Sequence, residues 1–155
     1  MAKNEHILFQ DIPLGSKNGT FHSAVLTTYA IDLIHFDCYL RNILHRKQIT
    51  SINILADSSQ LDKAVECVNP QFLTHIGKEY CVSSIKANGA FHPKINFFVG
   101  YNTVLVLIGS GNLTVTGHGK NHEAFTGFMI DADNDLHRPL IEECWEYILS
   151  FNVQL

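Results

Sequence analysis

Two residues that together can handle a phosphate group, His92 and Lys94, stand two positions apart in the apolar run Phe91–Val99. Alternate residues of a β-strand point to the same side, so this spacing predicts that the two side chains project together. Histidine serves as a nucleophile or proton carrier near neutral pH, and lysine is a point charge suited to a phosphate oxygen. So short a pattern more often marks a half-exposed histidine beside a solvated lysine, and other residues must decide between the two interpretations.

Two polar segments follow this pair along the chain. Gly109–Asn112 reads Gly-Ser-Gly-Asn at the end of an apolar run, where Ser110 and Asn112 supply hydrogen-bond donors and the glycines let a backbone approach a ligand. Glu123 opens the next apolar run, where a carboxylate can orient a histidine and stabilise its charged form. Each segment also has an ordinary explanation, because serine and asparagine often satisfy the turn itself and a glutamate at a loop end is usually solvated.

The N-terminal half of the chain alternates between the patterns of strands and helices. Short runs of β-branched and apolar residues predict buried strands, and apolar residues at helical spacing predict amphipathic helices. Two successive strand–helix units predict a parallel sheet. The expected elements are a strand over 23–31, a helix from a cap at Asp32 to about Lys47, a strand over Ser51–Ala56, and a helix capped by Ser58 or Ser59 that ends before Pro70.

The C-terminal half adds strands separated by turn signals and ends in an apolar stripe at helical spacing. We therefore expect an α/β sandwich with a mixed, largely parallel β-sheet flanked by helices, formed by one domain over 21–155, after an N-terminal arm or edge strand over 1–20. The expected elements are a strand over Tyr80–Ile85, a hairpin of Phe91–Val99 and Thr103–Ile108, a strand over Ala124–Ile130, and a last helix with Asp135 as a candidate cap and Pro139 in its first turn.

The composition is that of one globular domain, since the 155 residues are 46% hydrophobic and 17% charged. The four cysteines form no CxxC pair and their spacing with the nine histidines is not typical of zinc ligands, so we expect free thiols, a cytoplasmic protein and no metal site. No apolar run approaches the ~20 residues of a membrane-spanning helix, and a soluble protein without membrane contact is expected.

Charge is distributed unevenly along the chain. The net charge is −4, which is unlike the basic domains that bind nucleic acids. However, the segment from Tyr80 to His122 contains no Asp or Glu, and Lys86, Lys94 and Lys120 give it +3, so the rest of the chain sums to −7. Because an anion responds to the local field, this segment is the expected place for a polyanionic substrate.

The order His-x-Lys, Gly-Ser-Gly-Asn and Glu along the chain resembles the half-site motif of the phospholipase D superfamily, and the resemblance covers about residues 20–150. It implies that His92 attacks a phosphodiester to form a phosphohistidine, and that Lys94 and Asn112 bind the phosphate oxygens. It also implies that Ser110 adds a hydrogen bond and that Glu123 holds the His92 ring. In this family the chemistry requires no metal or other cofactor, because fixed donors stabilise the charge.

The chain departs from the fuller family pattern at one position. That pattern has an aspartate five residues after the lysine, where this chain has Val99. In lacking this aspartate the chain resembles branches of the family that include restriction-endonuclease-like and other bacterial nucleases. The missing aspartate argues against a lipid hydrolase more than against catalysis. We therefore expect a nuclease that cuts DNA or RNA, with His118 and Lys120 lining the substrate groove.

The half-site motif occurs once in the chain, with His92 and Lys94 as its His-x-Lys, whereas the reaction needs a second histidine to protonate the leaving oxygen. We therefore expect a homodimer in which His92 of two chains face each other. The absence of a target-reading module predicts either a small nonspecific nuclease or the catalytic domain of a longer protein, fused to or partnered with a DNA-recognition or helicase module. Two alternatives stay open, a phospholipid phosphodiesterase and a non-catalytic module for nucleic-acid binding or dimerisation.

Overall fold

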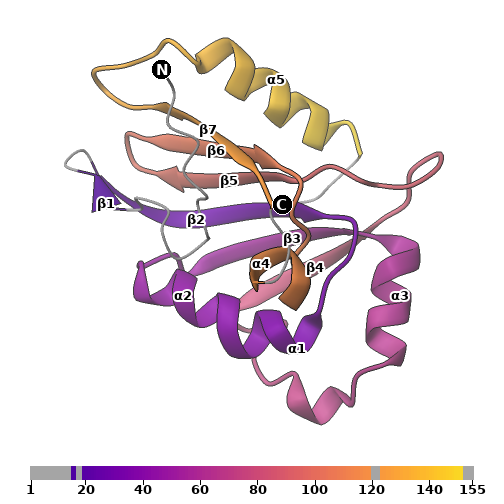
Figure 1. The fold of residues 1–155 in the computed structure, drawn as a ribbon. Helices are drawn as coiled ribbons and strands as arrows, with labels where there is room; N and C mark the ends of the chain where they lie inside the picture. Colours follow the sequence, from indigo (N-terminus) through magenta and orange to yellow (C-terminus); the bar gives the residue numbers. More distant parts are fainter. Residues whose placement is uncertain (1–14, 17–18, 120–122, 152–155) are drawn as a thin grey trace.

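The computed structural model describes residues 15–16, 19–119 and 123–151, and in this part of the chain a seven-stranded sheet lies between two helical layers (Figure 1). The strand order is β4-β3-β2-β5-β6-β7, and β1 pairs with β2 outside this path. The strands are β1 (Gly15–Ser16), β2 (Gly19–Thr28), β3 (Ser51–Asp57), β4 (Tyr80–Ile85), β5 (Ile95–Gly100), β6 (Val104–Gly109) and β7 (Phe125–Ile130).

The pairing of the strands divides the sheet into two parts. Strands β2, β3 and β4 run parallel, as the two strand–helix units predict. Strand β5 pairs antiparallel with β2, and β6 and β7 continue antiparallel from it. The expected mixed sheet is confirmed, although the parallel pairings are limited to β2–β4. A tight turn joins β5 to β6, and the connection from β6 to β7, which contains α4, returns to the same end of the sheet, so these strands pair antiparallel.

Helices cover both faces of the sheet. The first face is covered by one helical run after β2 and by α3, and the second by α5 (Figure 1). The helices are α1 (Leu33–His35), the π-helical η1 (Phe36–Leu40), α2 (Arg41–Arg46), α3 (Ser58–Glu66), the short 3₁₀ turn η2 (Pro70–Phe72), α4 (Val115–Gly119) and α5 (Arg138–Leu149).

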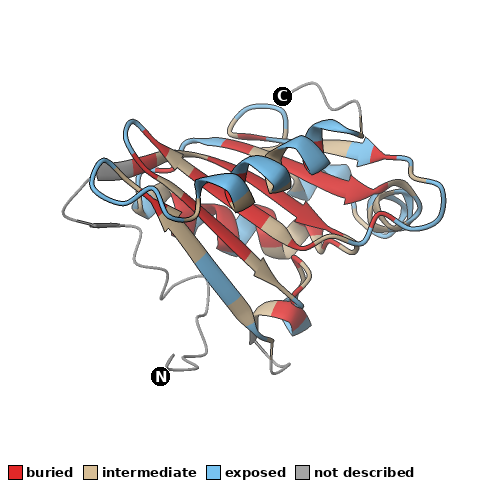
Figure 2. Cartoon of the chain, turned by 90° about the horizontal axis from the view of Figure 1, so that it is seen from above, coloured by how far each residue is buried: buried red, intermediate tan, exposed pale blue. Residues whose placement is uncertain are grey.

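Two apolar clusters form the core, one on each side of the sheet. Phe36, Leu40 and Leu44 of the first helical run are fully buried against one face. On the other face Ile141 and Ile148 of α5 are buried, while the acidic side of that helix is exposed (Figure 2). The buried central strands therefore follow from their continuous apolar runs, which suit strands packed on both faces.

Several boundaries differ from the sequence-based expectations. Asp32 caps the first helix as expected, but the cap of α3 is Asp57 instead of Ser58 or Ser59, and His137 instead of Asp135 precedes α5. An aspartate side chain at the end of a strand can reach the first amides of the next helix, which the sequence pattern did not distinguish from the serines that follow it.

The strand expected from Phe91 begins only at Ile95. Residues 91–94 have no regular secondary structure, so the expected placement of His92 and Lys94 on one face of a strand is wrong. Elsewhere, all four cysteines are free thiols, as expected. Among the described residues, every helix is too short or too polar to cross a membrane.

Candidate active site

The polar segments singled out by the sequence meet at one end of the sheet. Strand β2 ends there at Thr28 and β6 at Gly109, whereas the antiparallel β5 and β7 begin there. Gly109 N donates to the carbonyl of Lys94 at 3.1 Å, and Ser110 N donates to the carbonyl of Ala124 at 3.1 Å. Backbone pairing therefore holds the His-x-Lys, Gly-Ser-Gly-Asn and Glu123 segments side by side.

His92 and Lys94 contact each other directly. Lys94 Nζ lies 3.0 Å from Nδ1 of the His92 ring and 3.3 Å from the His92 carbonyl oxygen. A charged lysine has only donors, so the ammonium donates to Nδ1 in the tautomer that carries its proton on Nε2. The two residues are close because the ammonium folds back onto the ring, and not because a strand aligns them.

The two side chains differ in their exposure to solvent. His92 is exposed, whereas Lys94 is only 7% exposed. Burial lowers the pKa of Lys94, and the nearby charge of Glu123 opposes this effect only in part. A desolvated ammonium is stabilised when an anion comes within contact distance, so this end of the sheet favours a bound phosphate.

Asn112 is held by the end of β2. Its Oδ1 lies 3.3 Å from the backbone amide of Ala30 and accepts a hydrogen bond from it, and Thr28 Oγ1 lies 3.4 Å away. The next amide, Leu113 N, donates to Thr28 Oγ1 at 3.1 Å. These bonds engage the oxygen of the Asn112 side chain, and its NH₂ group is the part that can donate to a ligand.

The glycines around Asn112 have a packing role. A Cβ on Gly109 would lie 2.3 Å from the ring of Phe125 on β7, and a Cβ on Gly117 would lie 2.2 Å from the carbonyl oxygen of Asn112. Larger side chains would therefore displace the loop that carries Asn112. These glycines permit close approach of groups of the protein itself, and their expected role in approach to a ligand stays a prediction.

The side chains of Ser110 and Glu123 are joined by a hydrogen bond. Ser110 Oγ donates to Glu123 Oε2, and the amide of Ala124 donates to Ser110 Oγ at 3.2 Å. The Ser110 proton is thus directed at Glu123. The roles implied for these residues, a phosphate contact for Ser110 and support of the His92 ring for Glu123, stay predictions.

Tyr29 is a site residue that the sequence analysis treated only as part of a strand. Its ring centroid lies 4.5 Å from that of His92, with the planes tilted by 41°. It follows directly on Thr28, at the point where β2 ends beside the site. Tyrosine is common in strands, so nothing in its own sequence context marked it.

His118 and Lys120 were expected to line a substrate groove, and the structure describes only His118. Lys120 lies outside the described residues. His118 is half-buried on α4, and its ring centroid lies 6.3 Å from that of His35. Burial lowers the pKa of His118 to about 4, so the ring is neutral at neutral pH. A part in substrate binding stays a prediction for His118.

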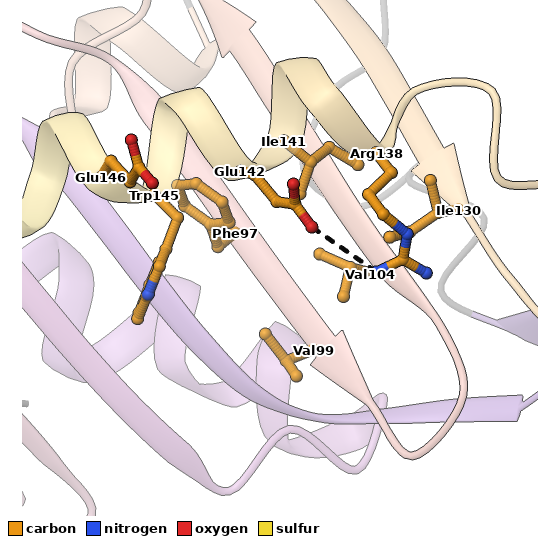
Figure 3. Close-up of a pocket in the computed structure, with 9 residues that line it drawn as sticks. All are labelled: Phe97, Val99, Val104, Ile130, Arg138, Ile141, Glu142, Trp145 and Glu146. Atoms are coloured by element: carbon orange, nitrogen blue, oxygen red, sulfur yellow. Dashed lines mark ion pairs between the residues drawn. The ribbon is translucent and has the colours of Figure 1, made fainter.

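A separate pocket of about 410 Å³ lies between α5 and the sheet (Figure 3). It is lined mainly by apolar side chains, among them Phe97, Val104 and Trp145, and none of the candidate site residues borders it. Val99, which stands where the family pattern has an aspartate, lines this pocket and lies near the far end of β5 from Lys94. Val99 is therefore separated from the contacts around His92 by most of the length of β5.

Within the described ranges, the structure contains no group of three or more His, Cys, Asp or Glu side chains arranged to hold a metal ion. The positive charge that the site offers to a ligand comes from the ammonium of Lys94. Asn112 is held at the same end of the sheet, and its NH₂ group can donate to a ligand. This set of groups is suited to binding and polarising a phosphodiester.

Comparison with solved structures places the fold. The chain matches yeast tyrosyl-DNA phosphodiesterase with a TM-score of 0.60 and 16% identity, covering 96% of this chain and 34% of that one. It matches NucT from Helicobacter pylori with a TM-score of 0.53 and 16% identity, covering 84% of this chain and 78% of that one. It matches Nuc from Salmonella typhimurium, a phospholipase D family member, with a TM-score of 0.53 and 14% identity, covering 89% and 82%.

These likenesses confirm the phospholipase D-like α/β fold that the motif resemblance implies. The chain spans about a third of the length of the yeast phosphodiesterase, and most of the length of the two bacterial proteins. No protein-family model matches the chain, and no curated protein sequence matches it.

Proposed function

We propose that this protein is a metal-independent phosphodiesterase that cleaves DNA or RNA. The observation that carries the proposal is the contact of Lys94 Nζ with His92 Nδ1 at 3.0 Å, at the end of the sheet where the backbone amide of Ala30 holds Asn112. A nucleophilic ring, a buried cation and a fixed amide donor are the groups that attack on a phosphodiester requires. The fold supports the proposal, since the matched proteins include a tyrosyl-DNA phosphodiesterase and a phospholipase D family member.

In the proposed first step, an unprotonated ring nitrogen of His92 attacks the phosphorus atom. A P–N bond forms, the P–O bond to the leaving group breaks, and the departing oxygen takes a proton from a general acid. Lys94 moves from the ring to a non-bridging phosphate oxygen, and Asn112 donates to the same phosphate. In the second step water attacks the phosphorus, the P–N bond breaks, and the acid that gave its proton receives one from the water.

The general acid of this scheme is a second histidine, and the chain contains the full half-site motif of His-x-Lys, Gly-Ser-Gly-Asn and Glu once. We propose that His92 of a second copy supplies it in a two-fold symmetric homodimer. The exposure of the His92 ring supports this arrangement, because a second ring can approach it from solvent. Each histidine would then act once as nucleophile and once as acid, according to which chain attacks.

The local charge favours a nucleic acid over a lipid. Residues 80–122 contain no carboxylate, while the chain as a whole has a net charge of −4. A polyanion is attracted to such a segment, and a phospholipid hydrolase would also need an apolar surface beside the site to hold the acyl chains. The apolar pocket lined by Val99 and Trp145 does not include His92 or Lys94. The four free thiols fit a reducing compartment, and a cytoplasmic location is part of this proposal.

The test is incubation with labelled single-stranded DNA, double-stranded DNA, RNA and phosphatidylcholine vesicles, all in EDTA. Wild-type protein should cleave a nucleic acid, and His92→Ala should not. The matched control is His22→Ala, because His22 also contacts a tyrosine ring, that of Tyr101 at 4.9 Å, at the other end of the sheet. Cleavage that requires magnesium, or that survives His92→Ala, contradicts the mechanism, and cleavage of the lipid alone contradicts the substrate class.

The shared site has its own test. Light scattering should show a dimer, and mixing wild-type protein with an excess of His92→Ala subunits should place most wild-type subunits in heterodimers that have lost activity. A strict monomer with full activity would exclude the shared site and leave the role of Lys94 unaffected.

A further inference from the structure

A buried aspartate joins the His92 segment to the rest of the fold. Asp57, at the end of β3, is 3% exposed. Its Oδ1 accepts hydrogen bonds from the amides of Ser59 at 3.1 Å and Gln60 at 3.2 Å and from the Ser59 hydroxyl at 2.6 Å. Its Oδ2 accepts a hydrogen bond from the amide of Phe91 at 2.8 Å. One carboxylate therefore connects the start of α3 with the residue directly before His92.

Capping α3 does not by itself explain a buried carboxylate at this position. No residue of α3 is buried, and serine or asparagine caps a helix about as well as aspartate. A cap also uses one oxygen, whereas both oxygens of Asp57 are engaged. The second oxygen serves a chain segment 34 residues away in sequence. Asp57 thus supplies a hydrogen-bond acceptor to the backbone of the Phe91 segment as well as to the helix.

Phe91 is held from two directions. Its side chain is 1% exposed, and its ring meets that of Phe151 edge to face with centroids 5.0 Å apart. Its amide is fixed by Asp57, in a stretch without the hydrogen-bond ladder of a strand. Together the two anchors determine where the backbone turns toward the site, and hence where the His92 ring meets Lys94.

We propose that Asp57 is a positioning residue, whose Oδ2 holds the Phe91 amide so that His92 and Lys94 keep their contact at the end of the sheet. Its effect on catalysis rests on the proposed phosphodiesterase function, whereas its effect on the placement of the ring does not. Burial alone would raise the pKa of Asp57, but the hydrogen bonds from Ser59, Phe91 and Gln60 outweigh it and lower the pKa, so the carboxylate stays charged at neutral pH.

Two substitutions of Asp57 distinguish its role as the cap of α3 from its hydrogen bond to the Phe91 amide. Asp57→Ser keeps an oxygen for the α3 amides but is too short to reach Phe91. Asp57→Asn keeps the shape and one oxygen, but places an NH₂ group against the Phe91 amide. The matched control is Ser59→Ala, which removes a bond to Oδ1 and leaves the Oδ2 bond intact.

The first readout needs no substrate. Amide exchange of Phe91 should become about tenfold faster or more in both Asp57 variants and stay near wild type in Ser59→Ala, because only the former lose the bond. The NMR signal of the His92 ring, assigned by its absence from His92→Ala, should shift in the same two variants. If Asp57→Ser does not fold, Asp57→Asn gives the same readouts.

The second readout is the rate of cleavage. We expect kcat to fall by about 10- to 100-fold in both Asp57 variants, with KM changed by less than about threefold, because the loss is one of geometry at the reacting group. Unchanged Phe91 exchange and an unshifted His92 signal in both variants would overturn the proposal, as would a kcat equal to that of Ser59→Ala. An inactive wild type with the expected NMR changes would refute the phosphodiesterase function and support the positioning role.

Discussion

Two clusters in this chain each place a histidine beside a buried charged group. They differ in how far the surrounding protein groups stabilise that charge. In the Asp37 cluster, which lies between η1 and the start of β4, the buried carboxylate of Asp37 accepts hydrogen bonds from His75 Nδ1 at 2.6 Å and from the Tyr80 hydroxyl at 3.0 Å. Arg41 donates to the Asp37 carbonyl and, at 2.6 Å, to the carboxylate of Glu79. In this cluster each carboxylate accepts hydrogen bonds from side chains of the fold.

The buried charge of the candidate active site is offset only in part, by the nearby charge of Glu123. Among the hydrogen bonds of the described residues, the ammonium of Lys94 bonds only to His92, and Glu123 bonds to Ser110. The pKa values move accordingly. Hydrogen bonds lower the pKa of Asp37 despite its burial, whereas burial lowers the pKa of Lys94 despite Glu123. A charge stabilised by its own fold indicates a structural role, and a charge left desolvated indicates a site that awaits a ligand.

The largest expected effect on function is that of Lys94→Met. It should lower kcat/KM about a thousandfold, because a fixed cation on the transition-state charge is lost. It should leave the free energy of unfolding unchanged or raise it, since a desolvated charge is replaced by an apolar side chain. Cleavage assays and urea unfolding give the two quantities. Lys86→Met, at an exposed lysine of the same carboxylate-free segment, is the control.

The largest expected effect on stability is that of Asp37→Asn. It should lower the free energy of unfolding by about 3 kcal/mol, because the partners of a buried carboxylate are left without it. The folded protein should keep its cleavage rate. Asp62→Asn, at an exposed position of α3, should change neither quantity. If Asp37→Asn abolished cleavage without loss of stability, the distinction between the two clusters would be wrong.

Acid should weaken the Asp37 cluster in a predictable direction. A carboxyl group whose pKa is lowered in the folded state contributes its stability above the unfolded pKa of about 4, and loses that contribution as the pH falls toward the folded value. The stability difference between wild type and Asp37→Asn should therefore be constant above about pH 5 and shrink below about pH 4. Urea unfolding across this range measures it, and a difference that grew in acid would contradict the assignment.

As the pH rises, Lys94 should lose its proton, and the candidate active site its positive charge, at a lower pH than an ordinary lysine does. Because the pKa of Lys94 is lowered, its charge is lost below the usual value of about 10.4, and cleavage should decline with that loss. Inorganic phosphate bound beside the ammonium should raise the pKa again. The pH dependence of kcat/KM reports the free protein, and a rate that stayed level to about pH 10.4 would indicate that the charge of Lys94 is not used.

The smallest expected effect is that of Tyr29. Tyr29→Phe keeps the ring against His92 and should retain nearly full activity. Tyr29→Leu should reduce kcat by about three- to tenfold, in line with the strength of a ring–ring contact. Equal losses in both variants would show that the hydroxyl group, and not the ring, is what the site requires.

Local patterns in the sequence predicted much of the fold. Apolar runs identified β2, β3, β4 and the hairpin of β5 and β6, and the cap at Asp32 was found because short polar side chains before a helical pattern are distinctive. The motif residues His92 and Lys94 were also singled out, although the strand that was expected to carry them begins later. The spacing was informative, and the geometry assigned to it was wrong.

The contacts that position the site could not be predicted in the same way. Asp57 bonds to Phe91, and Tyr29 packs on His92, across distances in sequence that no local pattern spans. Gly109 is required by Phe125, which lies on another strand. These relations depend on how the strands are ordered in the sheet. They become visible only when β2, β3, β5 and β7 are placed side by side.

The most direct test of the central claim is to trap the covalent intermediate on His92. Wild-type protein mixed with radiolabelled DNA in EDTA and quenched with detergent should retain label on the protein, in a linkage that is stable to base and labile to acid, as a phosphorus–nitrogen bond is. Peptide mapping by mass spectrometry should place the adduct on the His92 ring. Cleavage without any adduct, or an adduct on another residue, would contradict the account.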